Sequence, residues 1–175
     1  GMPWAANEAQ VKRRIGFAAG GVDWYPRRSL GELAQRTATF YPNWDDAVWS
    51  SCVELFALDE GKRVRELSEG MKVKANVALA LSHHAELLLL DEPTSGLDPV
   101  SRDELLEVFS GLAKHGVAIL FSTHITSDLD KCADVVTYIK GGRIVASCEK
   151  AEFTRRHCGG TLEDAMLLIE RGSRQ

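Results

Sequence analysis

The chain has 175 residues, which allows one domain of ordinary size and barely two. Its 21 Lys and Arg against 25 Asp and Glu give a net charge of −4, so it lacks the basic footprint that nucleic-acid binding requires. A hydrophobic fraction of 45% excludes a wholly disordered chain, and no apolar run approaches the roughly 18 residues of a membrane span. Four widely spaced cysteines favour reduced thiols in a cytosolic protein over a zinc site.

The first third of the chain predicts one short strand and two helices. Residues 11–17 are expected to form the strand, which the glycines after it end. Residues 29–39 carry the capping pattern Ser29-x-x-Glu32 and predict a helix. A second helix is expected over residues 45–58, whose apolar residues supply one face.

The centre and the C-terminal part predict an alternation of strands and helices. In chain order, these are a helix at 71–81, a strand at 87–90, a helix at 101–114, a strand at 117–121, a short helix at 127–132, a hairpin at 135–139 and 143–146, and a helix at 162–170. Asp98-Pro99 and Thr161-x-x-Asp164 are the expected helix caps. The continuous apolar runs of the two strands favour burial on both faces of a parallel sheet. The fold class is therefore α/β with a largely parallel core.

Four short segments that carry candidate catalytic or binding residues follow one another along the chain. They are the segment 67–71 (LSEGM) before a helix, Asp91-Glu92-Pro93 at a strand end, the segment 95–98 (SGLD), and Thr123-His124 after the next strand. In open α/β sheets, functional groups gather beyond the carboxyl ends of the strands. We therefore expect the side chains of Asp91, Glu92 and His124 to converge at one edge of the sheet.

Each segment alone also has an ordinary structural explanation. Ser68 suits a plain N-cap, the two acids suit a polar strand exit, and a lone histidine is more often structural than catalytic. In the alternative, functional interpretation, Asp91 would bind a magnesium ion and Glu92 would activate a water molecule. Ser68 and Gly70 would then bind a phosphate at a helix N-terminus, and His124 would bond a terminal phosphate or the attacking water.

Taken together, the four segments resemble the signature motif, Walker B strand, D-loop and switch histidine of the ATP-binding cassette (ABC) ATPases. The run from Leu67 to Leu106 carries most of this similarity, which extends from about Ile15 to about Lys150. Residues 40–45 (FYPNWD) and 162–164 (LED) also resemble the cassettes of bacterial exporters of the ABC-2 type.

The resemblance implies roles for the residues at the strand ends. Asp91 would hold Mg²⁺, Glu92 would polarise the hydrolytic water, and His124 would contact the γ-phosphate of ATP. ATP and Mg²⁺ are thus the cofactors expected of the complete domain.

The resemblance also implies partners, because the family works as a head-to-tail dimer. Ser68 and Gly70 would reach ATP bound on a second cassette, while Ser95 and Asp98 would signal across the dimer interface. The other expected partner is a transmembrane transporter subunit, which would place the chain in the cytoplasm, peripheral to the inner face of the membrane. No nucleic-acid partner is expected.

Two segments depart from the family pattern. Glu69 and Met71 stand where the commonest signature motif has Gly and Gln, and Glu69 adds a negative charge near the proposed phosphate site. The loop after the first strand should carry a glutamine, yet Ala19-Gly20-Gly21 has none.

The phosphate-binding P-loop motif, GxxxxGK[ST], does not occur in these 175 residues. The only Gly-Lys pair, Gly61-Lys62, is followed by Arg63. The family places this motif upstream of the glutamine loop, so we expect a partial ABC core without its N-terminal strands and P-loop. Such a chain alone should not bind or hydrolyse ATP appreciably, and its uncovered apolar sheet edges should invite pairing with another chain.

The motifs predict four parts. Residues 1–27 are the remnant of the glutamine-loop strand of the ATPase core, and residues 28–83 are a helical subdomain with the signature motif. Residues 84–150 are the part of the core with the Walker B strand, D-loop and switch histidine, and residues 151–175 are a C-terminal helix and tail. The leading interpretation is the C-terminal portion of a transporter cassette. Two alternatives stay open: a P-loop-less interaction or regulatory remnant that dimerises with a complete cassette, and the lobe of an ABC-type repair ATPase. No heptad repeat precedes Leu67, which counts against the repair ATPase.

Overall fold

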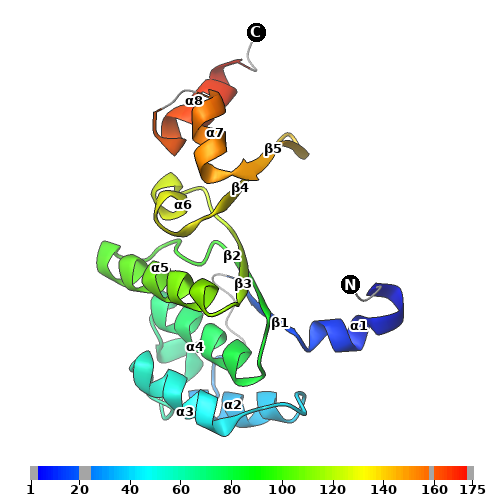
Figure 1. The fold of residues 1–175 in the computed structure, drawn as a ribbon. Coiled ribbons are helices and arrows are strands. Elements are labelled where there is room, and N and C mark those ends of the chain that lie inside the picture. The colour runs from blue at the N-terminus through cyan, green and yellow to red at the C-terminus, as the bar shows by residue number, and fades with distance from the viewer. Residues whose placement is uncertain (1–3, 20–24, 158–159, 173–175) are drawn as a thin grey trace. The chain divides into compact units, whose positions relative to one another are not determined.

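The computed structural model describes residues 4–19, 25–157 and 160–172, which divide into two compact units, residues 1–123 and 124–175 (Figure 1). The first unit contains α1 (Trp4–Lys12), β1 (Ile15–Ala19), α2 (Leu30–Ala38), α3 (Asp46–Leu55), the 3₁₀ turn η1 (Val64–Glu66), α4 (Glu69–Ser82), β2 (Leu87–Asp91), α5 (Pro99–Lys114) and β3 (Ala118–Ser122). The second contains α6 (Thr126–Cys132), β4 (Val135–Lys140), β5 (Arg143–Glu149), α7 (Lys150–His157) and α8 (Leu162–Gly172). The four-part division by motifs stays a prediction.

Side-chain caps fix where several helices begin, as the sequence predicts. At the start of α2, the Ser29 hydroxyl accepts a hydrogen bond from the backbone N–H of Glu32, whose carboxylate accepts one from the N–H of Ser29. Thr161 and Asp164 form the same reciprocal pair at the start of α8. Each such cap satisfies backbone donors that a helix leaves unpaired in its first turn.

Two segments differ from expectation. Residues 11–17 do not form one strand, because α1 extends to Lys12 and β1 begins only at Ile15. Strand pairing begins there, with Ile15 opposite Leu87, the first residue of β2. Helix α7 was not expected at all, since its sequence offers few apolar residues beyond Phe153, which is fully buried.

The first unit is built on a three-stranded parallel sheet in the order β1-β2-β3. Helices α4 and α5 cover one face of this sheet, against which Leu88 and Leu90 of β2 are buried (Figure 1). The other face is largely bare: Phe17 of β1 is 60% exposed and Leu120 of β3 is 63% exposed. The α/β class with a parallel sheet is thus confirmed, whereas the expectation that both faces of the strands are buried is wrong within the described residues.

Close packing between α4 and the sheet depends on a glycine in β1. A Cβ atom added at Gly16 would lie 2.3 Å from the Cβ of Ala80 and 2.8 Å from a methyl carbon of Leu88. Both distances are far below van der Waals contact, so any side chain at this position must push helix and sheet apart. Gly16 therefore sets how closely α4 approaches β1.

Replacing Gly16 with alanine is expected to lower the free energy of unfolding by about 1–3 kcal/mol, because overpacking strains a close-packed core. The matched control is Gly111→Ala, in the last turn of α5, where an added Cβ meets no atom within 4 Å. Alanine there should raise stability by about 1 kcal/mol through its helix propensity. Urea unfolding followed by circular dichroism measures both values, and equal effects of the two substitutions would contradict the packing argument.

The loop between α2 and α3 holds the C-terminal end of α4. The ring of Tyr41 stacks on His83, with 3.9 Å between ring centroids and 9° between the planes. The side-chain amide of Asn43 donates to the backbone carbonyl of His83 at 2.5 Å, and the backbone N–H of Asp45 donates to the carbonyl of Ser82 at 2.8 Å. Burial lowers the pKa of His83, so the stacked imidazole is neutral at pH 7.

The second unit is an antiparallel hairpin packed on helices. Gly141 and Gly142 turn the hairpin with positive φ angles of 56° and 73°, as the sequence predicts. One face of the hairpin packs into a small core, whose buried members are Val136, Tyr138, Phe153, Leu162 and Ala165. Across both units, none of the helices in the described ranges combines the length and hydropathy that a membrane crossing needs.

Candidate functional site

The two acidic residues predicted to carry chemistry lie at the carboxyl end of β2. Asp91 is the last residue of the strand and lies opposite Ser122, the last residue of β3. The Ser122 hydroxyl donates a hydrogen bond to the Asp91 carboxylate, and the backbone N–H of Glu92 donates to the Ser122 carbonyl at 3.1 Å. Ser122 therefore joins both acids to the neighbouring strand.

Sequence reasoning did not select Ser122. A serine at the end of an apolar strand carries no motif signal, and only the register of β2 against β3 brings it beside Asp91. The shared position at two strand ends would have been the one available clue, because parallel strands end at the same edge of a sheet.

Glu92 has an unusual backbone conformation. Its φ angle is +48°, in the left-handed region that residues with a Cβ rarely adopt. Such a conformation costs about 1–3 kcal/mol and persists only where neighbouring contacts enforce it. The bonds to Ser122 and a turn closed by the N–H of Ser95 on the Glu92 carbonyl, at 3.1 Å, supply those contacts. The chain therefore holds the Glu92 side chain in a direction that an ordinary strand exit would not give it.

The segment 95–98 follows as a tight turn into α5. Gly96 has a φ angle of +75°, and the Asp98 carboxylate caps α5 by accepting from the N–H groups of Val100 and Ser101, each at 3.1 Å. The Ser101 hydroxyl also donates to it at 2.6 Å, and these bonds lower the pKa of Asp98 below its ordinary value. Asp98 is thus an ionised helix cap, and Ser95 beside it is exposed. Their predicted role at a dimer interface stays a prediction.

The segment 67–71 begins α4 and meets the segment 95–98. Ser68 is the N-cap of α4, with its hydroxyl accepting from the N–H of Met71 at 3.3 Å, so its ordinary structural role is present. Gly70 is buried, and a Cβ added there would lie 3.4 Å from a methyl carbon of Leu97. The structure therefore brings the segments 67–71 and 95–98 together, with the N-terminus of α4 at their contact.

The negative charge of Glu69, where the family commonly has Gly, has a local partner. The ammonium group of Lys72 lies 2.8 Å from the Glu69 carboxylate, one turn along α4. The side chain of Lys72 is 15% exposed, so this pair is shielded from solvent on one side. Since an opposite charge this close offsets much of a carboxylate's field, Glu69 opposes a bound anion less than its charge alone indicates.

His124 and the glutamine-loop position lie beyond this group of residues. His124 is exposed and begins the second unit, two residues after the end of β3, so its approach to Asp91 and Glu92 stays a prediction. Of the loop Ala19-Gly20-Gly21, Gly20 and Gly21 lie outside the described residues.

The donor set at the strand ends suits magnesium. Asp91 offers a carboxylate and Ser122 a hydroxyl, both of them the oxygen ligands that Mg²⁺ prefers. In the described ranges, no cluster of three or more His, Cys, Asp or Glu side chains that could hold a metal is found. A site with so few protein ligands fits an ion that the phosphates of a nucleotide also coordinate.

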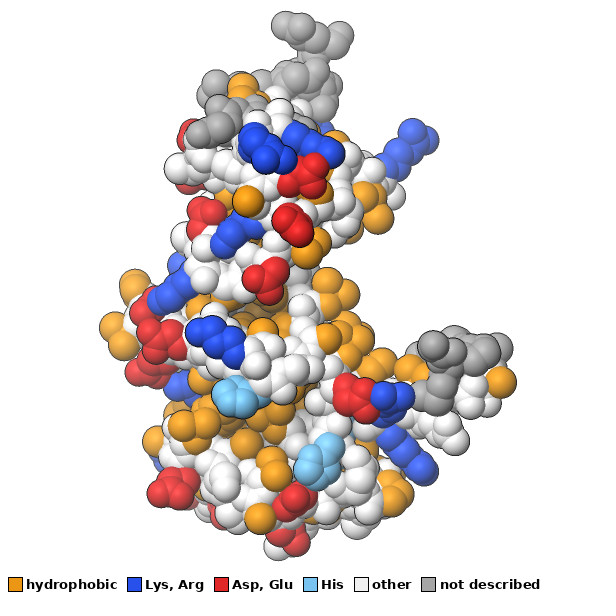
Figure 2. All heavy atoms as spheres, viewed as in Figure 1, with side chains coloured by type: hydrophobic (Ala, Val, Ile, Leu, Met, Phe, Trp, Pro, Cys, Tyr) orange, Lys and Arg blue, Asp and Glu red, His pale blue; other side chains and the backbone are white. Residues whose placement is uncertain are grey.

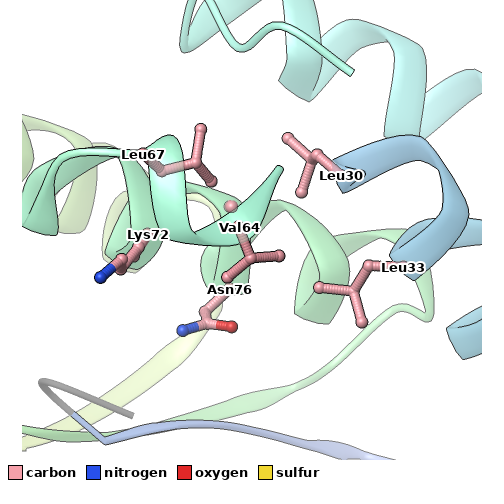
Figure 3. Close-up of a pocket in the computed structure, with 7 residues that line it drawn as sticks. Leu30, Leu33, Val64, Leu67, Lys72 and Asn76 are labelled. Carbon is pink, nitrogen blue, oxygen red and sulfur yellow. The ribbon is translucent and has the colours of Figure 1, made fainter. Parts of the chain in front are cut away.

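The cavities of the helical region lie away from these acids. One, of about 20 Å³, lies between α2, the η1 turn and α4, and has room for about one water molecule (Figure 3). Its lining is mainly aliphatic and includes Leu30, Leu33, Val64 and Leu67. It is a packing gap and offers no charged group beyond Lys72 at its rim.

Comparison with protein families and curated proteins gives consistent matches. A family model described as "AAA domain, putative AbiEii toxin, Type IV TA system" matches residues 12–129. The linearmycin resistance ATP-binding protein LnrL of Bacillus subtilis (strain 168) is 33% identical over 159 residues, 88% of this chain and 51% of that protein. The bacitracin transport ATP-binding protein BcrA of Bacillus licheniformis is 32% identical over 142 residues, 79% of this chain and 46% of that protein. The chain thus spans about half the length of these relatives.

Solved structures share the fold. A structure described as the ATP binding subunit of an ABC transporter matches with a TM-score of 0.83 and 24% identity, covering 97% of this chain and 74% of that one. The structure of cbiO1 from Clostridium perfringens, part of the ABC transporter complex cbiONQ, matches with a TM-score of 0.70 and 22% identity, covering 82% and 60%. At these identities the likeness concerns the fold alone.

Proposed function

Because the chain belongs to the ABC ATPase family, we propose that it is the C-terminal portion of an ATP-binding subunit that powers export by an ABC transporter. The observation that carries the proposal is the group at the end of β2, where Ser122 bonds the Asp91 carboxylate and the backbone of Glu92, whose φ angle is +48°. The names of the relatives, among them bacitracin transport and linearmycin resistance, support a role in transport.

The acids at the strand end divide the chemistry of ATP hydrolysis between them. Asp91, with the Ser122 hydroxyl beside it, would hold Mg²⁺, which when bound neutralises charge on the phosphates. Glu92 is the residue that orients and polarises the attacking water, because its carboxylate follows the Mg²⁺-holding residue directly and its backbone is fixed by Ser122. As the resemblance implies, His124, two residues after β3, would bond the γ-phosphate or that water when ATP is bound.

The N-terminus of α4 supplies the contact to the nucleotide of a second cassette. Ser68 and the adjacent N–H groups lie at the positive end of a 14-residue helix, an arrangement that favours a phosphate. Because Gly70 packs on Leu97, the segment 95–98 is well placed to sense whether that contact is made. The subunit would work in the cytoplasm beside a transmembrane partner.

The proposed function is tested by adding the P-loop motif that the 175-residue chain lacks. A strand, GxxxxGK[ST] loop and helix from a curated relative is joined ahead of this chain, and phosphate release from Mg-ATP is measured. The chimera is expected to hydrolyse ATP in the range of about 1–10³ turnovers per second that is ordinary for enzymes, or below it without a membrane partner. A folded chimera that binds Mg-ATP yet releases no phosphate would overturn the proposed function.

A further inference from the structure

The side chain of Ser122 contacts both of the acids at the end of β2. A serine hydroxyl carries one proton and two lone pairs. Here it donates its proton to the Asp91 carboxylate oxygen Oδ1 and accepts a hydrogen bond from the backbone N–H of Glu92 at 3.2 Å. The same N–H also donates to the Ser122 carbonyl at 3.1 Å. One residue of β3 therefore engages two consecutive residues that lie some 30 positions earlier in the chain.

Negative charge by itself does not distinguish Asp91 and Glu92. The chain has 25 Asp and Glu residues, and acidic side chains are scattered among basic ones over the face drawn in Figure 2. The two acids are distinguished by their bonding, because Ser122 on the neighbouring strand holds the side chain of one and the backbone of the other.

The bond from Ser122 orients the Asp91 carboxylate. An ionised carboxylate has two oxygens with about four lone-pair sites, so Asp91 can keep this bond on Oδ1 and still ligate a cation. Hydrogen-bonding partners of this kind orient metal ligands, and their loss typically costs about 10–100-fold in metal affinity or activity. The Ser122 hydroxyl is thus placed to prepare Asp91 for Mg²⁺.

The same hydroxyl helps to hold the strained backbone of Glu92. The N–H group that Ser122 binds belongs to the peptide unit between Asp91 and Glu92, so the orientation of this unit affects both residues. The φ angle of +48° at Glu92 persists only where neighbouring contacts enforce it. Removing the hydroxyl would leave the bond to the Ser122 carbonyl, and would therefore loosen this peptide unit without releasing it.

We propose that Ser122 is a positioning residue for ATP hydrolysis, whose hydroxyl aligns the Asp91 carboxylate for Mg²⁺ and the Glu92 backbone for the attacking water at the same time. This role rests on the proposed function and adds a coupling to it, because the cation site and the water site depend on one hydroxyl group. Loss of the hydroxyl should therefore weaken the use of Mg²⁺ and the chemical step together. A purely structural serine would affect stability alone.

Amide hydrogen exchange, measured by NMR on the 175-residue chain without nucleotide, tests the hydrogen bond itself. Ser122→Ala is expected to speed exchange at the Glu92 amide about two- to tenfold, the range to which the net contribution of one hydrogen bond converts. Ser122→Thr keeps a hydroxyl and should restore the slower rate. The matched control is Ser51→Ala on α3, where an exposed hydroxyl donates to the Ala47 carbonyl at 2.8 Å. This control should leave the Glu92 amide unchanged.

ATP hydrolysis by the P-loop chimera tests the positioning role. Ser122→Ala is expected to raise the Mg²⁺ concentration for half-maximal activity and to lower kcat, each about tenfold or more. Ser122→Thr should recover both quantities, and Ser51→Ala should change neither. Thermal unfolding followed by circular dichroism checks that the variants remain folded.

Three results would overturn the positioning role. They are an unchanged exchange rate of the Glu92 amide in Ser122→Ala, an unchanged Mg²⁺ requirement in the same variant, and a loss of activity that Ser122→Thr shares in full. An active chimera that Ser122→Ala leaves unaffected would overturn this role alone, and the proposed function would stand. A folded chimera that is inactive in every form would overturn the proposed function, and the positioning role with it.

Discussion

Glu92→Gln in the chimera that contains a P-loop is expected to lower kcat for ATP hydrolysis by about 10²–10⁴-fold, the usual contribution of a positioned general base. The substitution keeps the size of the side chain and leaves the backbone bonds to Ser122 in place, while it removes the carboxylate that polarises water. The KM for ATP should change little, because Glu92 acts on water and not on nucleotide binding. Steady-state phosphate release gives both constants.

The control is Glu107→Gln, which removes an equally negative, exposed carboxylate from α5 without touching the strand ends. It should leave kcat within about twofold of the unaltered chimera. A similar loss in both variants would trace the effect to net charge or stability. Retention of full kcat by Glu92→Gln would remove Glu92 from the chemistry.

Isothermal titration of the 175-residue chain itself with Mg-ATP is expected to show no binding at micromolar concentrations. The chain has no GxxxxGK[ST] sequence, and therefore lacks the backbone N–H groups and the lysine that cradle phosphates. Bonds to charged groups contribute about 1.5–3 kcal/mol each, so losing several weakens binding by many orders of magnitude.

The P-loop chimera titrated in the same way serves as the positive control for this measurement. Its heat of binding should fit a single site, whereas the 175-residue chain should give only heats of dilution. Clear micromolar binding by the chain alone would show that it builds a phosphate site from residues that the motif analysis did not select.

Local signals in the sequence predicted the helices and strands well, because each of those signals acts within a few residues. Ser29 with Glu32 and Thr161 with Asp164 begin helices in the structure because their side chains satisfy nearby backbone N–H groups. The two apolar runs form β2 and β3 for the same kind of reason. The run containing Leu120 could not reveal which layers cover it, since burial depends on elements far away in the chain.

The candidate site was likewise predicted in part from the sequence. The motifs located Asp91 and Glu92 at a strand end, and the structure places them there. The partner Ser122 and the left-handed conformation of Glu92 came only from the structure, because both depend on the register of β2 against β3. Spacing along a sequence cannot give a register between strands that lie some 30 residues apart.

The residues that carry the resemblance to ABC-2 exporters have a structural explanation in this chain. In the segment 40–45, Tyr41 stacks on His83 and Asn43 bonds the His83 carbonyl. These contacts fix the end of α4, so a packing requirement accounts for the two residues without reference to any cargo. The resemblance of this segment is therefore weak support for a particular substrate.

Helix α4 is continuous over its 14 residues, about 21 Å of rigid length. Its N-terminal end carries Ser68 and packs against Leu97. At its C-terminal end, Tyr41 stacks on His83 and Asn43 donates a hydrogen bond to the His83 carbonyl. Because the helix is rigid, a displacement of the 40–45 loop would be passed along α4 to its N-terminus and to the turn that precedes α5. Mechanical force applied at Tyr41 would thus reach Ser68 without any bond along the way being broken.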